Sequence, residues 1–72
     1  MDAPIDDGFY DAFVVWAAPR DDGDIVLDLT ITTGVRKGEV VHVRARVRRD
    51  PMELVGVACT LHVEDGIPRV EW

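Results

Sequence analysis

The chain has 72 residues, of which 47% are hydrophobic and 31% are charged, and its formal net charge is −6. These values are typical of one soluble globular domain near the lower size limit for a single hydrophobic core, and they exclude a membrane partner, because no apolar run approaches the roughly 18 residues that a span needs. The single cysteine excludes an internal disulfide and, with the acidic N-terminus MDAPIDDGFY, favours a cytoplasmic protein without a signal peptide.

The first residues of the chain show no hydrophobic periodicity. They contain Pro4, Gly8 and three Asp residues, which is typical of a loose segment. We therefore expect a flexible lead-in over residues 1–8 and a single domain over residues 9–72.

The run FYDAFVVWAA predicts a long first strand, because aromatic and β-branched residues dominate it. We expect alternate residues from Tyr10 to Val14 to face the core, since this phase turns Asp11 outward. A bulge near Val15 or Trp16 is expected to change the phase afterwards.

The segment PRDDGD predicts a turn. Pro19 restricts φ, the Asp side chains can accept hydrogen bonds from nearby amides, and Gly23 can adopt positive φ. A calcium loop is disfavoured, because an EF-hand spreads its ligands over about twelve residues.

Two alternating runs follow this turn. IVLDLTIT predicts a half-buried second strand, and EVVHVRARVR, after the turn TGVRKG, predicts a third. The third strand is expected to point these residues outward: Val40, His42, Arg44, Arg46 and Arg48. If Thr32 lies opposite Val40, Asp28 lies opposite Arg44 and leaves Arg46 without an acidic partner on that strand.

The segment DPMELVG predicts one or two helical turns, with Asp50 as the N-cap, Pro51 at the first helical position and Gly56 at the end. Its apolar residues are suited to close one end of a barrel. VACTLHV then predicts a fourth strand, in which Cys59 faces inward as a small buried hydrophobe, EDGIP predicts a turn, and RVEW predicts a fifth strand. We expect Trp16 and Trp72 to lie in the core or to plug the barrel ends.

The predicted order is β-β-β-α-β-β. An all-β domain with one short helix in this order favours a small five-stranded OB-like barrel, which closes most of its edges. A small open sheet capped by the helix, or an SH3-like barrel, is the alternative.

The stretches LTITTGVRKGEVVHVR and DPMELVGVACTLHVEDG resemble small OB-fold domains of phage and mobile-element proteins that are grouped with single-strand DNA-binding proteins. The resemblance covers about residues 25–66. It depends on these turn and core positions: Ile31, Thr32, Gly34, Lys37, Gly38, Leu54 and Gly56. It implies an OB fold and an association with single-stranded nucleic acid.

The charges divide the chain into two parts of opposite sign. Residues 1–28 carry eight Asp against Arg20, whereas residues 36–49 carry six Arg or Lys against Glu39. Guanidinium groups can bind phosphates in a bidentate manner and stack on bases. The candidate site for nucleic acid or another partner comprises Arg36, Lys37, His42, Arg44, Arg46, Arg48, Arg49 and Trp16.

Two functions follow from this surface. The first is a non-catalytic module that binds single strands through the basic face of the third strand, with Trp16, Tyr10 and Phe9 or Phe13 as stacking platforms if they face the same side. The second is a protein-interaction or scaffold module, self-association included, that uses the two-signed surface. A third interpretation is that Asp28 and the acidic first turn neutralise the arginines.

No pattern in the chain supports catalysis. The chain contains no serine, no phosphate-binding loop and no obvious pair of buried carboxylates, and so small a barrel leaves little room for a pocket of several hundred cubic ångströms. His42 and His62 have no cysteine or carboxylate at a ligand spacing. We therefore expect no enzyme, no metal and no cofactor.

Overall fold

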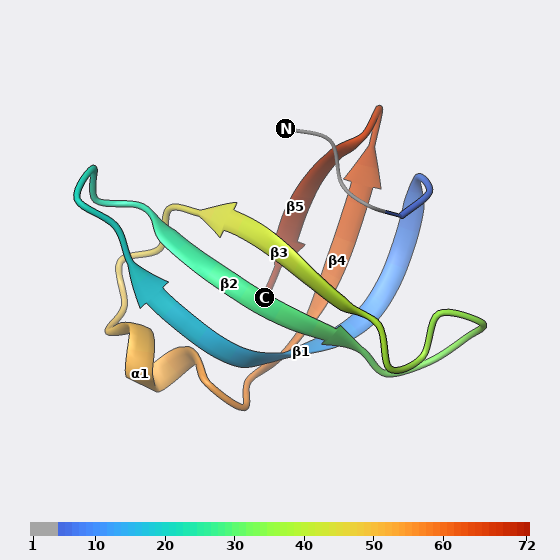
Figure 1. Ribbon diagram of the computed structural model, residues 1–72, viewed down its shortest axis with the longest axis horizontal. Helices are drawn as coiled ribbons and strands as arrows, with labels where there is room; N and C mark the ends of the chain where they lie inside the picture. Colours follow the sequence, from blue (N-terminus) through green and yellow to red (C-terminus); the bar gives the residue numbers. More distant parts are fainter. Residues whose placement is uncertain (1–4) are drawn as a thin grey trace.

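The computed structural model describes residues 5–72 as five antiparallel strands and one short helix in the predicted order. The elements are β1 (Gly8–Pro19), β2 (Ile25–Ile31), β3 (Val40–Ala45), α1 (Pro51–Leu54), β4 (Ala58–Glu64) and β5 (Ile67–Glu71). The strands form one sheet in the order β3-β2-β1-β4-β5, which curls strongly into a half-barrel (Figure 1). The predicted mostly-β class is therefore confirmed.

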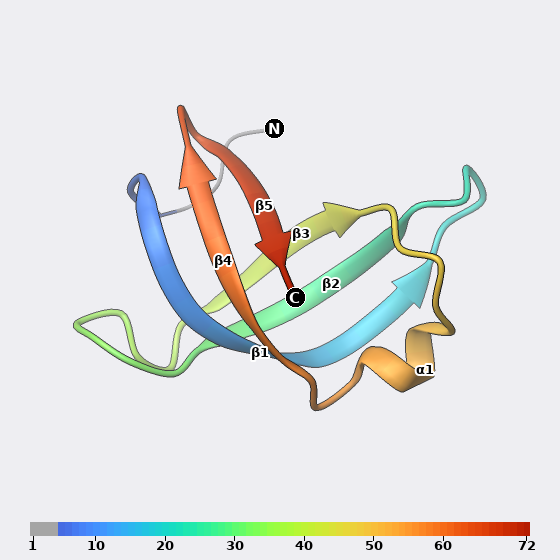
Figure 2. The same ribbon diagram turned by 180° about the vertical axis from the view of Figure 1, so that it is seen from behind.

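The half-barrel is open along one side. Its two edge strands, β3 and β5, approach each other across the concave side but do not pair (Figure 2). The long central strand β1 joins the two halves, because its later part pairs with β2 and its earlier part pairs with β4. Each half of the sheet therefore depends on β1.

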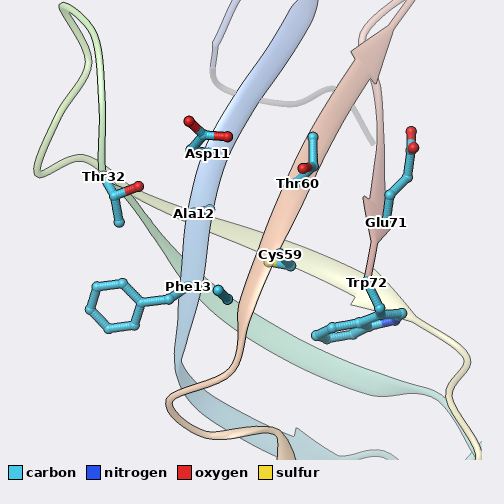
Figure 3. Close-up of a pocket in the computed structure, with 9 residues that line it drawn as sticks. Asp11, Ala12, Phe13, Thr32, Cys59, Thr60, Glu71 and Trp72 are labelled. Atoms are coloured by element: carbon cyan, nitrogen blue, oxygen red, sulfur yellow. The ribbon is translucent and has the colours of Figure 1, made fainter.

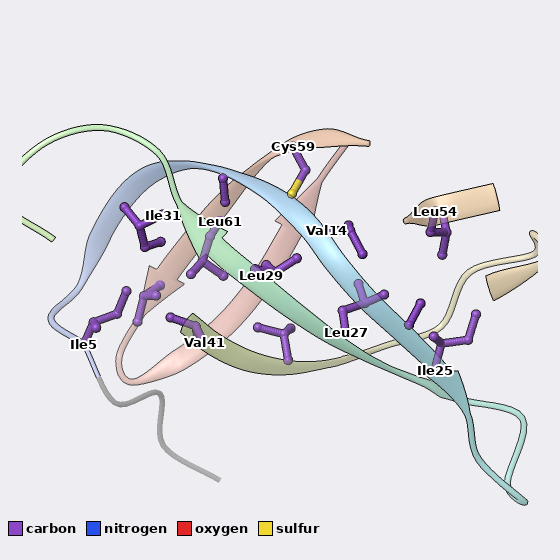
Figure 4. Packing of buried hydrophobic residues seen from close by; sticks show 14 residues of the cluster. Ile5, Val14, Ile25, Leu27, Leu29, Ile31, Val41, Leu54, Cys59 and Leu61 are labelled. Atoms are coloured by element: carbon purple, nitrogen blue, oxygen red, sulfur yellow. The ribbon is translucent and has the colours of Figure 1, made fainter. Parts of the chain in front are cut away.

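The hydrophobic core fills the concave side, and every strand except β5 contributes to it along with α1 (Figure 4). No charged or polar side chain is buried in the described part of the chain. Burial of one large aliphatic side chain stabilises a fold by about 1.5–3 kcal/mol, so packing carries the stability of this domain. The buried residues are Ile5, Ala12, Val14, Ala17, Ile25, Leu27, Leu29, Ile31, Val41, Val43, Leu54, Cys59, Leu61 and Val63.

The predicted faces of the strands are confirmed. Ala12 and Val14 are buried, Tyr10 packs partly against the core, and Cys59 is buried in β4. A β-bulge lies between Val14 and Trp16, as expected from the sequence.

Of the two positions expected for the tryptophans, the core or the barrel ends, the core is wrong for both. Trp16 is 52% exposed and Trp72 is 48% exposed. The bulge turns Val15 and Trp16 outward together, and smaller aliphatic side chains already fill the concave side. Both indoles are therefore available on the surface.

The short helix α1 follows the predicted capping pattern. The Asp50 side chain accepts a hydrogen bond from the Met52 amide at 2.9 Å, and Pro51 occupies the first turn. Leu54 is fully buried, whereas Met52 and Val55 are exposed, so Leu54 is the apolar residue of this segment that enters the core. Within residues 5–72, no helix has both the length and the apolar character that crossing a membrane would require.

The register of β2 and β3 differs from the prediction by two residues. Thr30 pairs with Val40, and Asp28 pairs with His42 rather than Arg44. The turn encloses as many residues as predicted but begins one residue earlier, because the Ile31 amide donates to the carbonyl of Glu39 and the Gly38 amide donates to the carbonyl of Ile31. A shift of two residues keeps each side chain on its predicted face.

The strand ends also differ. β3 ends at Ala45, so Arg46 and Arg48 lie beyond it, and β5 begins at Ile67 directly after a two-residue turn. Residues 1–4 of the expected lead-in lie outside the described residues. Residues 5–8 contact the domain: Ile5 is buried in the core, and the Asp7 carboxylate accepts hydrogen bonds from the β4–β5 turn.

Candidate functional site

The structure spreads the predicted basic residues along the whole length of β3 and beyond it. His42 and Arg44 point outward from β3, and Arg46 follows the end of the strand. Arg36 and Lys37 lie in the β2–β3 turn, at the opposite end of the sheet from the connection that carries Arg48 and Arg49 (Figure 1). The predicted site is therefore not one continuous patch.

The central cations are paired with the acidic residues of β2 and the β1–β2 turn. The Nε of Arg46 donates to Oδ1 of Asp24 at 3.0 Å. Arg44 lies 3.7 Å from Asp22 and 3.9 Å from Asp24. The interpretation that the acidic turn neutralises the arginines is thus supported for these two residues.

His42 has a carboxylate neighbour that its sequence spacing did not reveal. Its Nδ1 lies 2.6 Å from Oδ1 of Asp28, the residue directly across from it on β2. Trp16 pairs with the same Asp28 from the other side, on β1. Trp16, Asp28 and His42 therefore form one row across three strands.

Arg36, at the far end of β3, is also paired. It lies 3.4 Å from Glu39 and 3.3 Å from Asp6. The charge of Glu39, followed by that of Asp6, raises the pKa of the Arg36 guanidinium. Arg36 therefore stabilises the turn locally and is not free for a ligand.

One carboxylate of the acidic turn, that of Asp22, has a lowered pKa. The backbone amide of Asp24 donates to the Asp22 carboxylate at 3.0 Å. This hydrogen bond, followed by the charges of Arg44 and Arg20, lowers the pKa of Asp22 below its ordinary value. Asp22 consequently remains a counter-charge for Arg44 at neutral pH.

Three cations of the predicted site remain without an ion pair among residues 5–72: Lys37, Arg48 and Arg49. Lys37 is separated from the two arginines by the length of β3 (Figure 1). A nucleic-acid strand bound along the sheet would therefore meet unpaired cations mainly at the two ends.

Exposed apolar side chains gather between these ends, on the convex outer face of the sheet. Phe13 pairs with Thr30, which in turn pairs with Val40, and the bulge adds Val15 and Trp16. We call Phe13, Val15, Trp16 and Val40 the outer apolar strip. The strip lies on the same outer face as His42 and Arg44. Phe13 and Trp16 therefore face the same side of the sheet as these cations, which is what a role as stacking platforms requires. Tyr10 instead faces the core side.

A groove that the sequence did not predict runs over β4. Its space of about 630 Å³ is an open groove rather than an enclosed cavity, so the expectation of little room for a substrate pocket stays a prediction. Asp11, Thr60 and Glu71 pair side by side across β1, β4 and β5 at one end of it, and Phe13 and Trp72 flank the other end (Figure 3). Its lining consists of Asp11, Ala12, Phe13, Thr32, Ala58, Cys59, Thr60, Glu71 and Trp72. We call this surface the β4 groove.

Long-range strand pairing explains why the sequence did not reveal the β4 groove. Alternation placed Asp11 outward, but the pairing of β1 with β4 joins segments from opposite ends of the chain. No local pattern gives that register.

Features for metal binding and nucleophilic chemistry are few. In the part of the chain that the structure describes, no three His, Cys, Asp or Glu side chains are grouped so that they could hold a metal ion. His62 stacks on Phe9 with ring centroids 4.0 Å apart and lies 3.5 Å from Glu71. Burial raises the pKa of the Cys59 thiol, so that the reactive thiolate form is disfavoured.

Comparison of the chain with known protein families, with curated proteins and with solved structures found no match.

Proposed function

We propose that this domain is a non-catalytic binding module that engages a protein partner through the outer face of its sheet. The observation that carries the proposal is the outer apolar strip, in which Phe13, Val15, Trp16 and Val40 are all exposed on one face. Protein interfaces combine an apolar, aromatic-rich centre with a polar rim. The strip has this composition, because paired acidic and basic residues border it.

The paired charges favour a protein partner over a polyanion. A phosphate backbone would have to displace Asp22 and Asp24 from Arg44 and Arg46, and it would approach a chain whose formal net charge is −6. A protein with its own acidic and basic side chains can instead match both signs along the rim.

Site-specific photo-crosslinking in the native host tests the proposal. A photoreactive amino acid replaces Trp16 in one variant and Met52 in a control, because both side chains are exposed but Met52 lies on α1, away from the strip. A discrete protein adduct at position 16, absent at position 52 and lost when Val40→Asp is added, is the expected result. Equal crosslinking at both positions, or none at position 16, would overturn the proposal.

Single-stranded nucleic acid is the second candidate, because one specific observation favours it. Trp16 and Phe13 share the outer face with His42 and Arg44, which combines stacking platforms with cations. Five strands with a helix between the third and fourth suit a partly open OB-type barrel, and such barrels include oligonucleotide binders. The likeness to phage and mobile-element single-strand binding domains supports the same candidate.

Titration of a labelled oligonucleotide at low ionic strength tests this second candidate. Salt-sensitive binding that an Arg46→Glu, Arg48→Glu variant loses is the result expected of a nucleic-acid module. If this variant and the wild type bind the oligonucleotide equally, the nucleic-acid candidate is excluded.

A further inference from the structure

We infer that the β4 groove binds the side chain of a lysine or arginine residue of the partner protein. This inference rests on the proposed function, because it assumes a protein partner. It specifies which chemical group of the partner is recognised. The β4 groove lies next to the outer apolar strip, and Phe13 is the one residue that the two surfaces share.

The shape of the groove follows from side-chain size on three neighbouring strands. Ala58 and Thr60 are the outward residues in the first half of β4, and both are small. Phe13 stands beside Ala58 on β1, and Trp72 follows the end of β5 on the other side of β4 (Figure 3). The Trp72 indole is directed toward β4, whereas the Phe13 ring is directed away from β4 on the far side of β1, so the indole borders the space over Ala58 and Thr60 (Figure 3).

The two carboxylates at the other end of the β4 groove favour a positively charged ligand. Asp11 and Glu71 flank Thr60 in one row across the three strands. The Thr33 hydroxyl donates to Asp11 at 3.2 Å, and His62 lies 3.5 Å from Glu71. Within residues 5–72, neither carboxylate is paired with an arginine or lysine, in contrast to Asp22 and Asp24. A cationic group would supply the missing counter-charge.

A lysine or arginine side chain fits both ends of the groove. Its methylene stem can pack against Trp72 and Ala58, and its charged head can reach Asp11, Glu71 and the Thr60 hydroxyl. Aromatic faces attract cations as well, and tryptophan does so most strongly. An anionic ligand would meet two carboxylates, and a neutral apolar ligand would desolvate them without compensation.

The inference is tested with small probes in an NMR titration of the full chain. The probes are N-acetyl-arginine amide and N-acetyl-lysine amide, with the uncharged N-acetyl-norleucine amide as the matched control. Saturable shifts of the Ala58 and Thr60 amides and of the Trp72 indole with the cationic probes, and not with the norleucine probe, are expected. Absence of these shifts, or equal shifts with norleucine, would overturn the inference.

A pair of variants separates a specific site from general charge attraction. Asp11→Asn combined with Glu71→Gln should weaken probe binding roughly fivefold, whereas Asp21→Asn combined with Asp65→Asn removes the same charge away from the groove and should leave binding unchanged. All four side chains are exposed, and a dispersed amide spectrum confirms that each variant folds. Equal weakening by both double variants would contradict a specific site.

Crosslinking distinguishes failure of this inference from failure of the proposed function. The Asp11→Asn, Glu71→Gln variant should reduce the adduct formed at position 16. If the adduct forms undiminished, a partner binds the outer apolar strip without using the groove, and only the groove assignment is wrong.

Discussion

The carboxylate of Asp7 accepts a hydrogen bond at 3.0 Å from the backbone amide of Gly66, which lies 59 residues further along the chain. The amide of Asp65 donates to the same carboxylate at 2.9 Å. Asp65 and Gly66 both have positive φ, at 54° and 76°, which is the conformation of a tight type I′ hairpin turn. One side chain before β1 thus satisfies both central amides of the turn that joins β4 to β5.

Replacement of Asp7 with alanine should lower the free energy of unfolding by about 1 kcal/mol, because two amides lose an ionised acceptor. Urea denaturation measures the change. Asp21→Ala serves as the control, since Asp21 is an exposed aspartate in the β1–β2 turn, and it should change the midpoint little. Equal effects of the two variants would show that net charge, rather than the hydrogen bonds, is responsible.

Leu54→Ala should destabilise the domain by about 2–5 kcal/mol, because Leu54 is the only buried side chain of α1 and its loss leaves a cavity at the end of the core. Met52→Ala, two residues earlier and 64% exposed, should stay within about 0.5 kcal/mol of the wild type. Thermal and urea unfolding of both variants provide the comparison. A small effect of Leu54→Ala would mean that α1 is dispensable for the core.

Asp22→Asn combined with Asp24→Asn should release Arg44 and Arg46 from their internal partners. If these ion pairs mask a cationic surface, the affinity for a labelled single-stranded oligonucleotide at low ionic strength should rise about tenfold. Fluorescence anisotropy measures it, with Asp21→Asn, Asp65→Asn as the variant of equal net charge. A double variant at positions 22 and 24 that binds no better than this control would count against masking and against the nucleic-acid candidate.

Burial raises the pKa of the Cys59 thiol above its ordinary value, which makes stability depend on pH in the alkaline range. The folded state holds the thiol proton more tightly than the unfolded state, so its contribution is complete below the unfolded pKa and is lost as the pH rises through the folded pKa. The urea midpoint should therefore fall more between about pH 8 and about pH 10 for the wild type than for Cys59→Ala. Parallel curves for the two proteins would contradict this.

Local patterns predicted the faces of the strands well and the contacts between strands poorly. Alternation of apolar and polar residues placed Leu27, Val43 and Leu61 in the core, because a side chain changes face with every residue of a strand. The register of β2 and β3 depended on the residue at which the turn between them begins, and the hydrogen bond from Ile31 to Glu39 is not visible in composition.

Contacts between strands were still harder to predict for the candidate site than for the core. The outward position of His42 and Arg44 was predictable, but their pairing with Asp28 and Asp22 required the register and the path of the β1–β2 turn. The exposure of Trp16 depended on where the bulge falls, since a shift by one residue sends a side chain to the other face. The β4 groove depended on pairing between strands from opposite ends of the sequence.

The central position of β1 in the sheet has a consequence for co-translational folding. This strand is synthesised first, but it pairs with β4, whose residues Ala58–Glu64 emerge much later. Until β4 emerges, the Gly8–Phe13 part of β1 has no partner strand on that side, and unpaired strand edges are prone to intermolecular β-aggregation. Charged residues that flank aggregation-prone runs act as gatekeepers. Asp6 and Asp7 precede this part of β1 and Asp11 lies within it, so we expect their charges to limit aggregation of the nascent chain until β4 is available.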